Sequence, residues 1–278
     1  YMESVWWLLA QLHKKGMLYK GYTIQPYSPM AGTGLSSHEL NQPGTYRDVK
    51  DTTIVAQFHA TADSRAALLE KVGLADDGLP IDFLAWTTTP WTLPSNTALT
   101  VGPKITYAMV KTTNRYTDTP GYVVLAEALV GKQFGDKKAP AHEVVATLQG
   151  QDLVGLRYEA LLDWAVPMHS PEQAFQVILG DFVTTEDGTG IVHTAPTFGA
   201  DDARVAKDAG VPAMLVDDGT GNGVPLVDLR GRFRVGPFQG RHVKVEFDLE
   251  ALDESKPVDV EIAILLKERG QAFKVEKY

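Results

Sequence analysis

One segment gathers hydroxyl and indole side chains directly after a predicted strand: residues 86–96 read WTTTPWTLPSN. Its two prolines remove backbone donors and fix the backbone, so we expect the segment to leave the sheet. Hydroxyls both donate and accept hydrogen bonds, which suits the binding of a ribose, an ester carbonyl or an ordered water. The alternative is an edge strand whose threonines hydrogen-bond the local backbone, and composition alone favours this alternative.

A second segment, residues 186–202, reads EDGTGIVHTAPTFGADD and brings a histidine and two aspartates into one stretch. We predict a turn, a strand through His193, and a helix that begins at Gly199 and holds two aspartates in its first turn. Carboxylates there are ordinarily caps or dipole partners. Because one carboxylate is enough to cap, either Asp201 or Asp202 is free to bind a cation such as a substrate α-ammonium. A single histidine at a strand end is more often structural than catalytic.

The rest of the chain lacks the motifs of several common chemistries. It contains no cysteine, which excludes disulfides, thiolate nucleophiles and cysteine-ligated zinc. The seven histidines are scattered and lack the paired spacing of a hydrolytic zinc site. There is no Gly-x-Ser-x-Gly elbow, Walker lysine or dinucleotide glycine fingerprint, so we expect neither a common serine hydrolase nor a nucleotide-binding loop.

Short runs of β-branched and aromatic residues, separated by turn residues, surround these two segments. They predict strands at residues 53–58, 81–86, 105–110, 122–125, 144–148 and 175–179. Helices are predicted at residues 3–12, 64–72, 127–133, 201–209 and 260–269. Many short strands with a few small helices indicate a mainly β protein with short α-helices and a closed or rolled sheet, not a doubly wound one.

Composition limits the classes of protein that this chain can represent. Of its 278 residues 44% are hydrophobic and 22% charged, which supplies a core and excludes a disordered chain. This length allows two domains or one large β-rich domain with appendages. The net charge of −9 disfavours broad clamping of nucleic-acid phosphates. Because no apolar run spans a bilayer and no secretory signal begins the chain, we expect a cytoplasmic protein without a membrane partner.

Together, the two segments resemble the editing domain of isoleucyl-tRNA synthetases, which is the connective-peptide insertion of a class I aminoacyl-tRNA synthetase. The stretch WTTTPWTLP is similar to the isoleucyl version of the first motif, whereas valyl and leucyl versions typically have Thr-Thr-Arg-Pro followed by Glu or Asp. Residues 188–202 are similar to the second motif. The resemblance extends more weakly to residues 3–7, 26–28 and 32–40.

The resemblance implies a β-barrel-like editing domain with a mixed α/β stem. We expect residues 46–240 to form the editing domain, residues 1–45 an N-terminal stem segment with a helix and a strand, and residues 241–278 a C-terminal stem segment. Because the chain begins at Tyr1 and stops abruptly at Tyr278, we expect it to be a piece of a longer synthetase. The ATP-binding signatures of the family are not in this sequence, so we expect no aminoacylation from it.

The resemblance also assigns roles to eight residues. Asp202 would bind the α-ammonium of the substrate, and His193 would limit the side-chain pocket so that valine fits and isoleucine clashes. The catalytic set is Thr87, Thr88, Thr89 and Asp202, and the substrate-binding set is Trp86, Thr92, Asn96 and His193. Residues 197–199 depart from the Gly-His-Gly of many bacterial relatives, which leaves the pocket wall there open.

The activity implied is post-transfer hydrolysis of the ester of mischarged valyl-tRNA(Ile), by an oriented water assisted by the neighbouring ribose hydroxyl. The alternatives are a non-catalytic module that docks the tRNA acceptor end, and an editing domain of valyl or leucyl type. The partners implied are the aminoacylated 3′ end of tRNA(Ile) and the remainder of the parent synthetase. We expect no cofactor here, because the parent uses ATP and Mg2+ elsewhere. We expect no metal, because Ser28 and Ala31 stand where many relatives have a zinc-binding cysteine pair.

Overall fold

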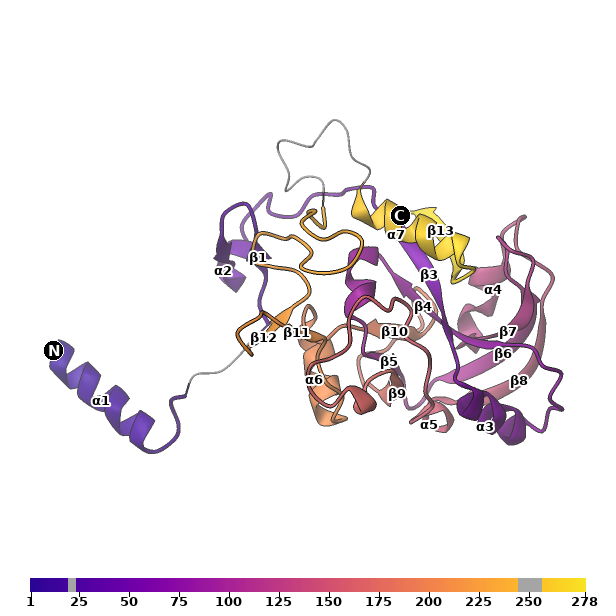
Figure 1. Cartoon of the computed structure of the whole chain (residues 1–278), viewed down its shortest axis with the longest axis horizontal. Helices are drawn as coiled ribbons and strands as arrows, with labels where there is room; N and C mark the ends of the chain where they lie inside the picture. The colour runs from indigo at the N-terminus through magenta and orange to yellow at the C-terminus, as the bar shows by residue number, and fades with distance from the viewer. Residues whose placement is uncertain (20–23, 245–256) are drawn as a thin grey trace.

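A curved sheet is the main feature of the computed structural model, which describes residues 1–19, 24–244 and 257–278 (Figure 1). Nine strands of the described chain form this sheet. Seven of them follow one another in the order β8 (Glu143–Gln149), β6 (Thr106–Thr113), β7 (Pro120–Ala126), β4 (Ile81–Thr87), β10 (Ile191–Thr194), β5 (Ala98–Val101) and β9 (Gln176–Leu179). In addition, β3 (Thr52–His59) pairs with β4, and β13 (Ala272–Lys277) pairs with β3.

The pairing partner on one side of β4 changes along the strand. This strand pairs antiparallel with β3 from Asp82 to Thr87. On its other side its first residues pair in parallel with β7, whereas Trp86 near its end pairs with Val192 of β10. Because the partner changes from β7 to β10, the sheet opens at the carboxyl end of β4, where the chain leaves it after Thr87.

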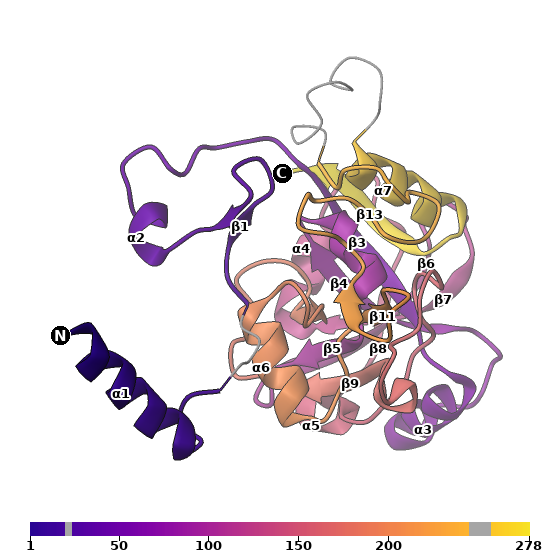
Figure 2. The same cartoon turned by 60° about the vertical axis from the view of Figure 1, so that its left-hand side comes forward.

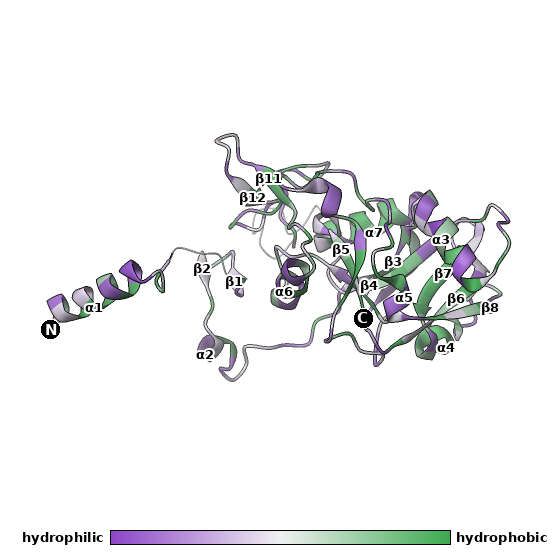
Figure 3. Ribbon diagram, turned by 90° about the horizontal axis from the view of Figure 1, so that it is seen from below, coloured by the Kyte–Doolittle hydropathy of each residue, from purple (hydrophilic) through white to green (hydrophobic). Residues whose placement is uncertain are grey.

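Helices cover both faces of the sheet. The inner core lies on the face where Phe83 packs with Leu68 of α3 (Ala62–Val72) and Ile262 of α7 (Val258–Glu268). On the opposite face Leu84 packs with Phe134 of α4 (Val130–Phe134), because successive strand residues point to opposite faces. The central strands are accordingly hydrophobic along their length, as their colour in Figure 3 shows.

The remaining elements lie outside this sheet, and all of them except α1 are short. They are α1 (Met2–Lys14), β1 (Tyr27–Ser28), β2 (Thr33–Gly34), α2 (Ser37–Leu40), η1 (Pro90–Ser95), η2 (Glu127–Leu129), α5 (Gly150–Leu153), η3 (Pro171–Gln173), α6 (Ala200–Asp208), β11 (Leu215–Asp217) and β12 (Gly223–Pro225), where η denotes a 3-10 helix. β1 and β2 form one small antiparallel pair, and β11 and β12 form another. None of the described helices has the length and apolar character needed to cross a membrane.

The prediction of a mainly β protein with short α-helices is confirmed, and each of the six predicted strands is present. The structure also contains elements that were not predicted, and two differences lie close to the site. The four-residue strand β5 was not predicted, because its short run follows a proline-rich segment. Phe175, predicted to begin a strand, instead precedes β9 and has a φ of 62°, in the left-handed region that a bulky residue rarely adopts.

The two predicted stem segments differ in how they meet the sheet. The N-terminal segment holds α1, whose residues are not buried and which lies apart from the sheet in Figures 1 and 2. In the C-terminal segment α7 packs on the inner core, and β13 pairs antiparallel with β3 from Ala272 to Lys277. Residues 245–256 of that segment lie outside the described residues. The boundaries at residues 45/46 and 240/241 stay predictions.

Candidate active site

The threonine-rich segment leaves the sheet at the end of β4, as predicted. Its two prolines, which lack a backbone N–H, lie inside the 3-10 helix η1, with Pro90 at its first position. Before the helix starts, the chain turns through a hydrogen bond that the Thr89 N–H donates to Thr87 Oγ1 at 3.1 Å. The segment is therefore shaped by proline and by a short threonine turn, and it projects beyond the strand.

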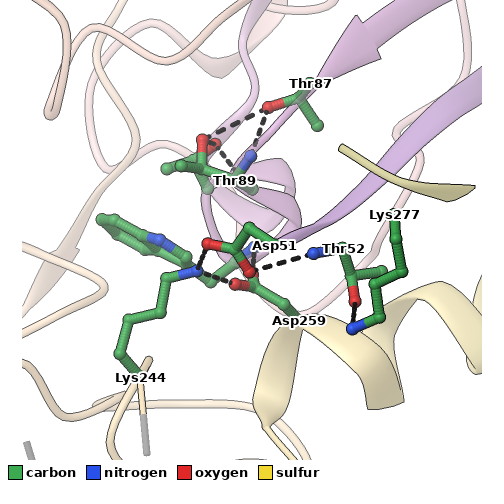
Figure 4. Close-up of polar contacts among 9 residues, drawn as sticks. Asp51, Thr52, Thr87, Thr89, Lys244, Asp259 and Lys277 are labelled. Atoms are coloured by element: carbon green, nitrogen blue, oxygen red, sulfur yellow. Dashed lines mark hydrogen bonds and ion pairs between the residues drawn. The ribbon is translucent and has the colours of Figure 1, made fainter. Parts of the chain in front are cut away.

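Three threonine hydroxyls of this segment form a continuous cluster. Thr87 Oγ1 and Thr89 Oγ1 are 3.2 Å apart, and Thr89 Oγ1 lies 3.4 Å from Thr92 Oγ1. Thr92 Oγ1 donates to the backbone oxygen of Thr89 at 2.8 Å, which fixes the direction of its hydroxyl. Figure 4 shows Thr87 and Thr89 facing each other at the end of the strand. The half-buried Thr88 makes no side-chain hydrogen bond to a described residue.

His193, on the neighbouring strand β10, joins this cluster with a defined tautomer. Asn96 Nδ2 donates to His193 Nδ1 at 2.9 Å and to the Ala98 oxygen at 2.8 Å, while Asn96 Oδ1 accepts from the Tyr158 hydroxyl at 2.6 Å. These partners assign the orientation of the amide, so Nδ1 is an acceptor and the ring proton sits on Nε2. His193 Nε2 then donates to Thr92 Oγ1 at 3.0 Å.

The buried imidazole of His193 is neutral. Burial lowers its pKa to about 4, because the charged form would lose its hydration. Both ring nitrogens are occupied, Nδ1 by the amide of Asn96 and Nε2 by the hydroxyl of Thr92. In this arrangement the ring is fixed at both nitrogens and donates a hydrogen bond, and it has no lone pair available to act as a general base.

Asp202 presents a carboxylate close to His193 along the chain. Its Oδ2 accepts from the Ala195 N–H at 2.8 Å, and its Oδ1 has no hydrogen-bond partner among the described residues. Burial raises the pKa of Asp202, although the Ala195 N–H opposes the rise. The preceding Gly199 leaves space for it, because a Cβ there would lie 2.7 Å from Asp202 Cγ. Asp201 is exposed and pairs with Arg204 at 3.5 Å.

The two aspartates therefore differ from the helix caps that sequence alone suggests. α6 begins after Gly199 and has no side-chain cap hydrogen bond. The carboxylate of Asp202 turns back to the loop that follows β10, and its free oxygen can receive a cation. A cation there would restore the hydrogen bonding that a half-buried carboxylate requires.

Aromatic side chains connect the two motifs on one face of the sheet, whereas the Trp86 side chain lies on the other face. Trp91 and Phe198 pack edge to face with ring centroids 4.9 Å apart, so Phe198 of the second motif lies against η1 of the first. Trp86 follows Ala85 and precedes Thr87 on β4, so it points to the opposite face of the sheet. There it packs on Tyr278, with ring centroids 5.5 Å apart. The structure thus brings Trp86 together with the C-terminus and not with the threonine cluster.

One contact of this site was missed by reasoning from sequence. The backbone N–H of Trp91 donates to Asp259 Oδ1 at 2.7 Å. Asp259 also pairs with Lys244, which in turn pairs with Asp51 at 2.6 Å (Figure 4). The only signal in the sequence was an acidic residue directly before the helix predicted at residues 260–269, and such a residue ordinarily caps its own helix.

The described residues offer no cluster of three or more His, Asp or Glu that could hold a metal ion. A cavity of about 550 Å³ lies elsewhere, beside the ion pair of His59 with Asp82 and next to Asn114. None of its lining residues belongs to the threonine and histidine cluster, so its volume gives no measure of the candidate site.

Comparison with known proteins identifies relatives along the whole chain. The family model described as tRNA synthetases class I (I, L, M and V) matches residues 1–214. The isoleucine–tRNA ligase of Bacteroides fragilis is 53% identical over 310 residues, an alignment that covers 100% of this chain and 26% of that protein. The isoleucine–tRNA ligase of Treponema denticola is 39% identical over 288 residues, covering 99% of this chain and 24% of that protein.

Solved structures share the fold. The crystal structure of GlLeuRS-CP1 matches with a TM-score of 0.58 and 16% identity, over 81% of this chain and 98% of that one. The P. falciparum cytosolic leucyl-tRNA synthetase editing domain matches with a TM-score of 0.54 and 10% identity, over 81% and 99%. The chain spans about a quarter of the length of the curated relatives it matches. It therefore belongs to the class I tRNA synthetase family, as a segment of the isoleucyl type with the fold of the editing domain.

Proposed function

We propose that this chain hydrolyses the ester that joins valine to tRNA(Ile), as the editing domain of an isoleucyl-tRNA synthetase. The observation that carries the proposal is the hydrogen bonding of the Asp202 carboxylate. One of its carboxylate oxygens is held by the Ala195 N–H, while the other has no hydrogen-bond partner in the described chain. A half-buried oxygen of this kind suits an ammonium group. His193, two residues before Ala195, connects this carboxylate to the hydroxyls that suit an ester or a water.

A separate hydrolytic site is useful because binding alone separates isoleucine from valine poorly. Valine is isoleucine minus one methylene, and a pocket separates such molecules by only about 1–3 kcal/mol, a limit for which isoleucyl enzymes are themselves the standard illustration. A second pocket that admits valine and excludes isoleucine removes the error after it has been made. The isoleucyl relatives, one of them at 53% identity, support this substrate over those of the leucyl domains, with which only the fold is shared.

In the proposed complex Asp202 binds the α-ammonium of the valyl ester, and the threonine hydroxyls hold the ester, the ribose and a water. We assign Thr87, Thr88 and Thr89 to the catalytic set and Thr92 to substrate binding. His193 is the wall that excludes the larger side chain. It suits that role because its ring is neutral and held at both nitrogens. Asn96 acts through His193, since its amide faces the ring and the backbone.

The hydrolysis we propose uses an oriented water. Its oxygen attacks the ester carbonyl carbon, the bond from that carbon to the ribose oxygen breaks, and the water proton passes to the departing ribose oxygen. The neighbouring ribose hydroxyl of the substrate assists this proton transfer. The threonines orient the water, and positioning of this kind lowers the barrier without a protein nucleophile. The occupied nitrogens of His193 support a route in which no histidine acts as base.

The partners we propose are the aminoacylated 3′ end of tRNA(Ile) and the rest of a cytoplasmic parent synthetase. A net charge of −9 suits a domain that receives one aminoacylated adenosine while other regions hold the phosphate backbone. We expect no cofactor in this domain and no aminoacylation by it.

The decisive experiment measures release of valine from valyl-tRNA(Ile) by the wild type and by Asp202→Asn. The amide can still accept from the Ala195 N–H but carries no charge, so the fold stays and ammonium binding is lost. A hydrogen bond to a charged group contributes about 1.5–3 kcal/mol, so kcat/KM should fall about 10- to 150-fold. Asp201→Asn is the matched control, because this exposed neighbour lies on the same helical turn and should leave the rate unchanged.

The same assay separates the alternatives. A wild type that binds the acceptor end but releases no valine would identify a docking module. Faster release of threonine or norvaline than of valine, each from its mischarged tRNA, would identify a valyl or leucyl type of specificity. Full activity of Asp202→Asn would refute the role given to its charge.

A further inference from the structure

The 3-10 helix η1 begins with a backbone donor that its own neighbourhood does not satisfy. Pro90, its first residue, has no N–H, and the Thr92 N–H already bonds to the Thr89 oxygen at 3.0 Å. Thr89, at the N-cap position, makes no side-chain cap hydrogen bond. The opening N–H groups of a helix lack partners within the helix, so the Trp91 N–H needs an acceptor from elsewhere.

Asp259 supplies that acceptor from a position 168 residues further along the chain. Its Oδ1 accepts from the Trp91 N–H at 2.7 Å. The residue is only 1% exposed and lies in the first turn of α7, which packs on the inner core. A buried carboxylate on a packed helix is a fixed point, so it holds the start of η1 at a set distance from α7.

Two further residues make this carboxylate compatible with burial. Burial raises the pKa of Asp259, and hydrogen bonding from Lys244 opposes the rise. Lys244 also pairs with Asp51 at 2.6 Å, and Figure 4 shows both carboxylates beside the one ammonium group. A buried charge is tolerated when it is paired and hydrogen-bonded, and Asp259 meets both conditions.

The segment held in this way carries the proposed chemistry. Trp91 packs on Phe198 of the second motif. The Thr92 hydroxyl donates a hydrogen bond to the Thr89 backbone oxygen and accepts one from His193 Nε2. We infer that Asp259 is a positioning residue for ester hydrolysis, which caps η1 through the Trp91 N–H and so sets the threonine cluster. This inference rests on the proposed function and extends the site to the C-terminal part of the chain.

Three variants test it. Asp259→Ala removes the acceptor and the charge, whereas Asp259→Asn removes the charge and keeps an oxygen for the Trp91 N–H. Glu261→Ala is the matched control, because Glu261 lies in the same helical turn and pairs with Arg241 at 2.7 Å, and in the described chain no hydrogen bond or ion pair joins it to η1. The measurements are kcat and KM for valyl-tRNA(Ile), hydrogen exchange of the Trp91 amide, and urea unfolding.

We expect Asp259→Ala to lower kcat about tenfold with KM nearly unchanged, the loss that a displaced catalytic segment causes. Asp259→Asn should stay within about threefold of the wild type, and Glu261→Ala should keep the wild-type kcat. Exchange of the Trp91 amide should be slow in the wild type and in Asp259→Asn, and fast in Asp259→Ala.

Some results would overturn the inference. They are an Asp259→Ala variant with wild-type kcat, or a Trp91 amide that stays protected in it. If Asp259→Ala does not fold, Asp259→Asn decides alone, and a tenfold loss of kcat in this variant overturns the inference. A wild type that releases no valine refutes the proposed function instead, and the exchange of the Trp91 amide still reports whether Asp259 holds η1.

Discussion

Replacing Tyr158 by Phe removes one hydroxyl from behind His193 and leaves the ring in place. The Tyr158 ring is buried in the inner core and packs edge to face on Phe58 and Phe175, with ring centroids 5.4 Å and 6.1 Å away. Because the ring stays, the substitution creates almost no cavity. Its cost comes from the hydrogen bond to Asn96 Oδ1, which would be left buried without a donor. We expect stability to fall by about 1–2 kcal/mol.

The same contacts predict whether the Asn96 amide turns over in this variant. In the native orientation Nδ2 donates to the Ala98 oxygen and to His193 Nδ1, so turning loses two hydrogen bonds and places two carbonyl oxygens together. That costs at least about 2 kcal/mol, whereas staying leaves one oxygen unsatisfied. The amide therefore stays, His193 keeps its proton on Nε2, and valine release should stay within about threefold of the wild type.

Urea unfolding and the 15N chemical shifts of the histidine rings check this prediction. Tyr107→Phe is the matched control. The buried Tyr107 hydroxyl donates to the Gly190 oxygen at 2.7 Å and accepts from the Gly102 N–H at 2.9 Å, and neither of these groups hydrogen-bonds the His193 ring. Losing two bonds should cost about 2–4 kcal/mol, more than Tyr158→Phe. The reasoning fails if Tyr158→Phe costs more than the control, or if it moves the proton of His193 to Nδ1.

The remaining predictions concern pH and specificity. Burial raises the pKa of Asp202 above its ordinary value of 3.8, so valine release should fall, as the pH is lowered, at a higher pH than for an exposed aspartate. Because the folded state binds this proton more tightly than the unfolded chain, protonation of Asp202 stabilises the folded state. The far-UV circular dichroism should therefore stay constant while the rate of valine release falls. His193→Ala should release isoleucine from isoleucyl-tRNA(Ile) at least about tenfold faster than the wild type, because it removes the wall. An unchanged rate would place the size limit on another residue.

Local signals determined much of the fold in advance. The predicted strands correspond to β3, β4, β6, β7, β8 and β9, because β-branched runs bounded by turn residues fit a pleated surface. The exit of the chain after Thr87 followed from two prolines, and the start of α6 followed from Gly199. Gly190 in the second motif also has a local reason, because its φ of 73° lies in the left-handed region that favours glycine.

The orientation of side chains around the site required the tertiary structure. Trp86 adjoins the threonines in sequence, yet the two-residue period of a strand turns it to the opposite face, where it packs on Tyr278. Asp202 lies where a helix cap is expected, yet its carboxylate bonds to the Ala195 N–H in the preceding loop. A pattern in one segment cannot say which neighbour a side chain will meet.

The sequence by itself determined the family, the mainly β fold and the two motifs, because each depends on residue types at short spacing. Only the tertiary structure decided the proton position on His193 and the anchoring of η1. Those depend on Tyr158, 62 residues from Asn96, and on Asp259, 168 residues from Trp91. Contacts across such separations arise when the curved sheet and α7 pack together, and no local spacing in the chain encodes them.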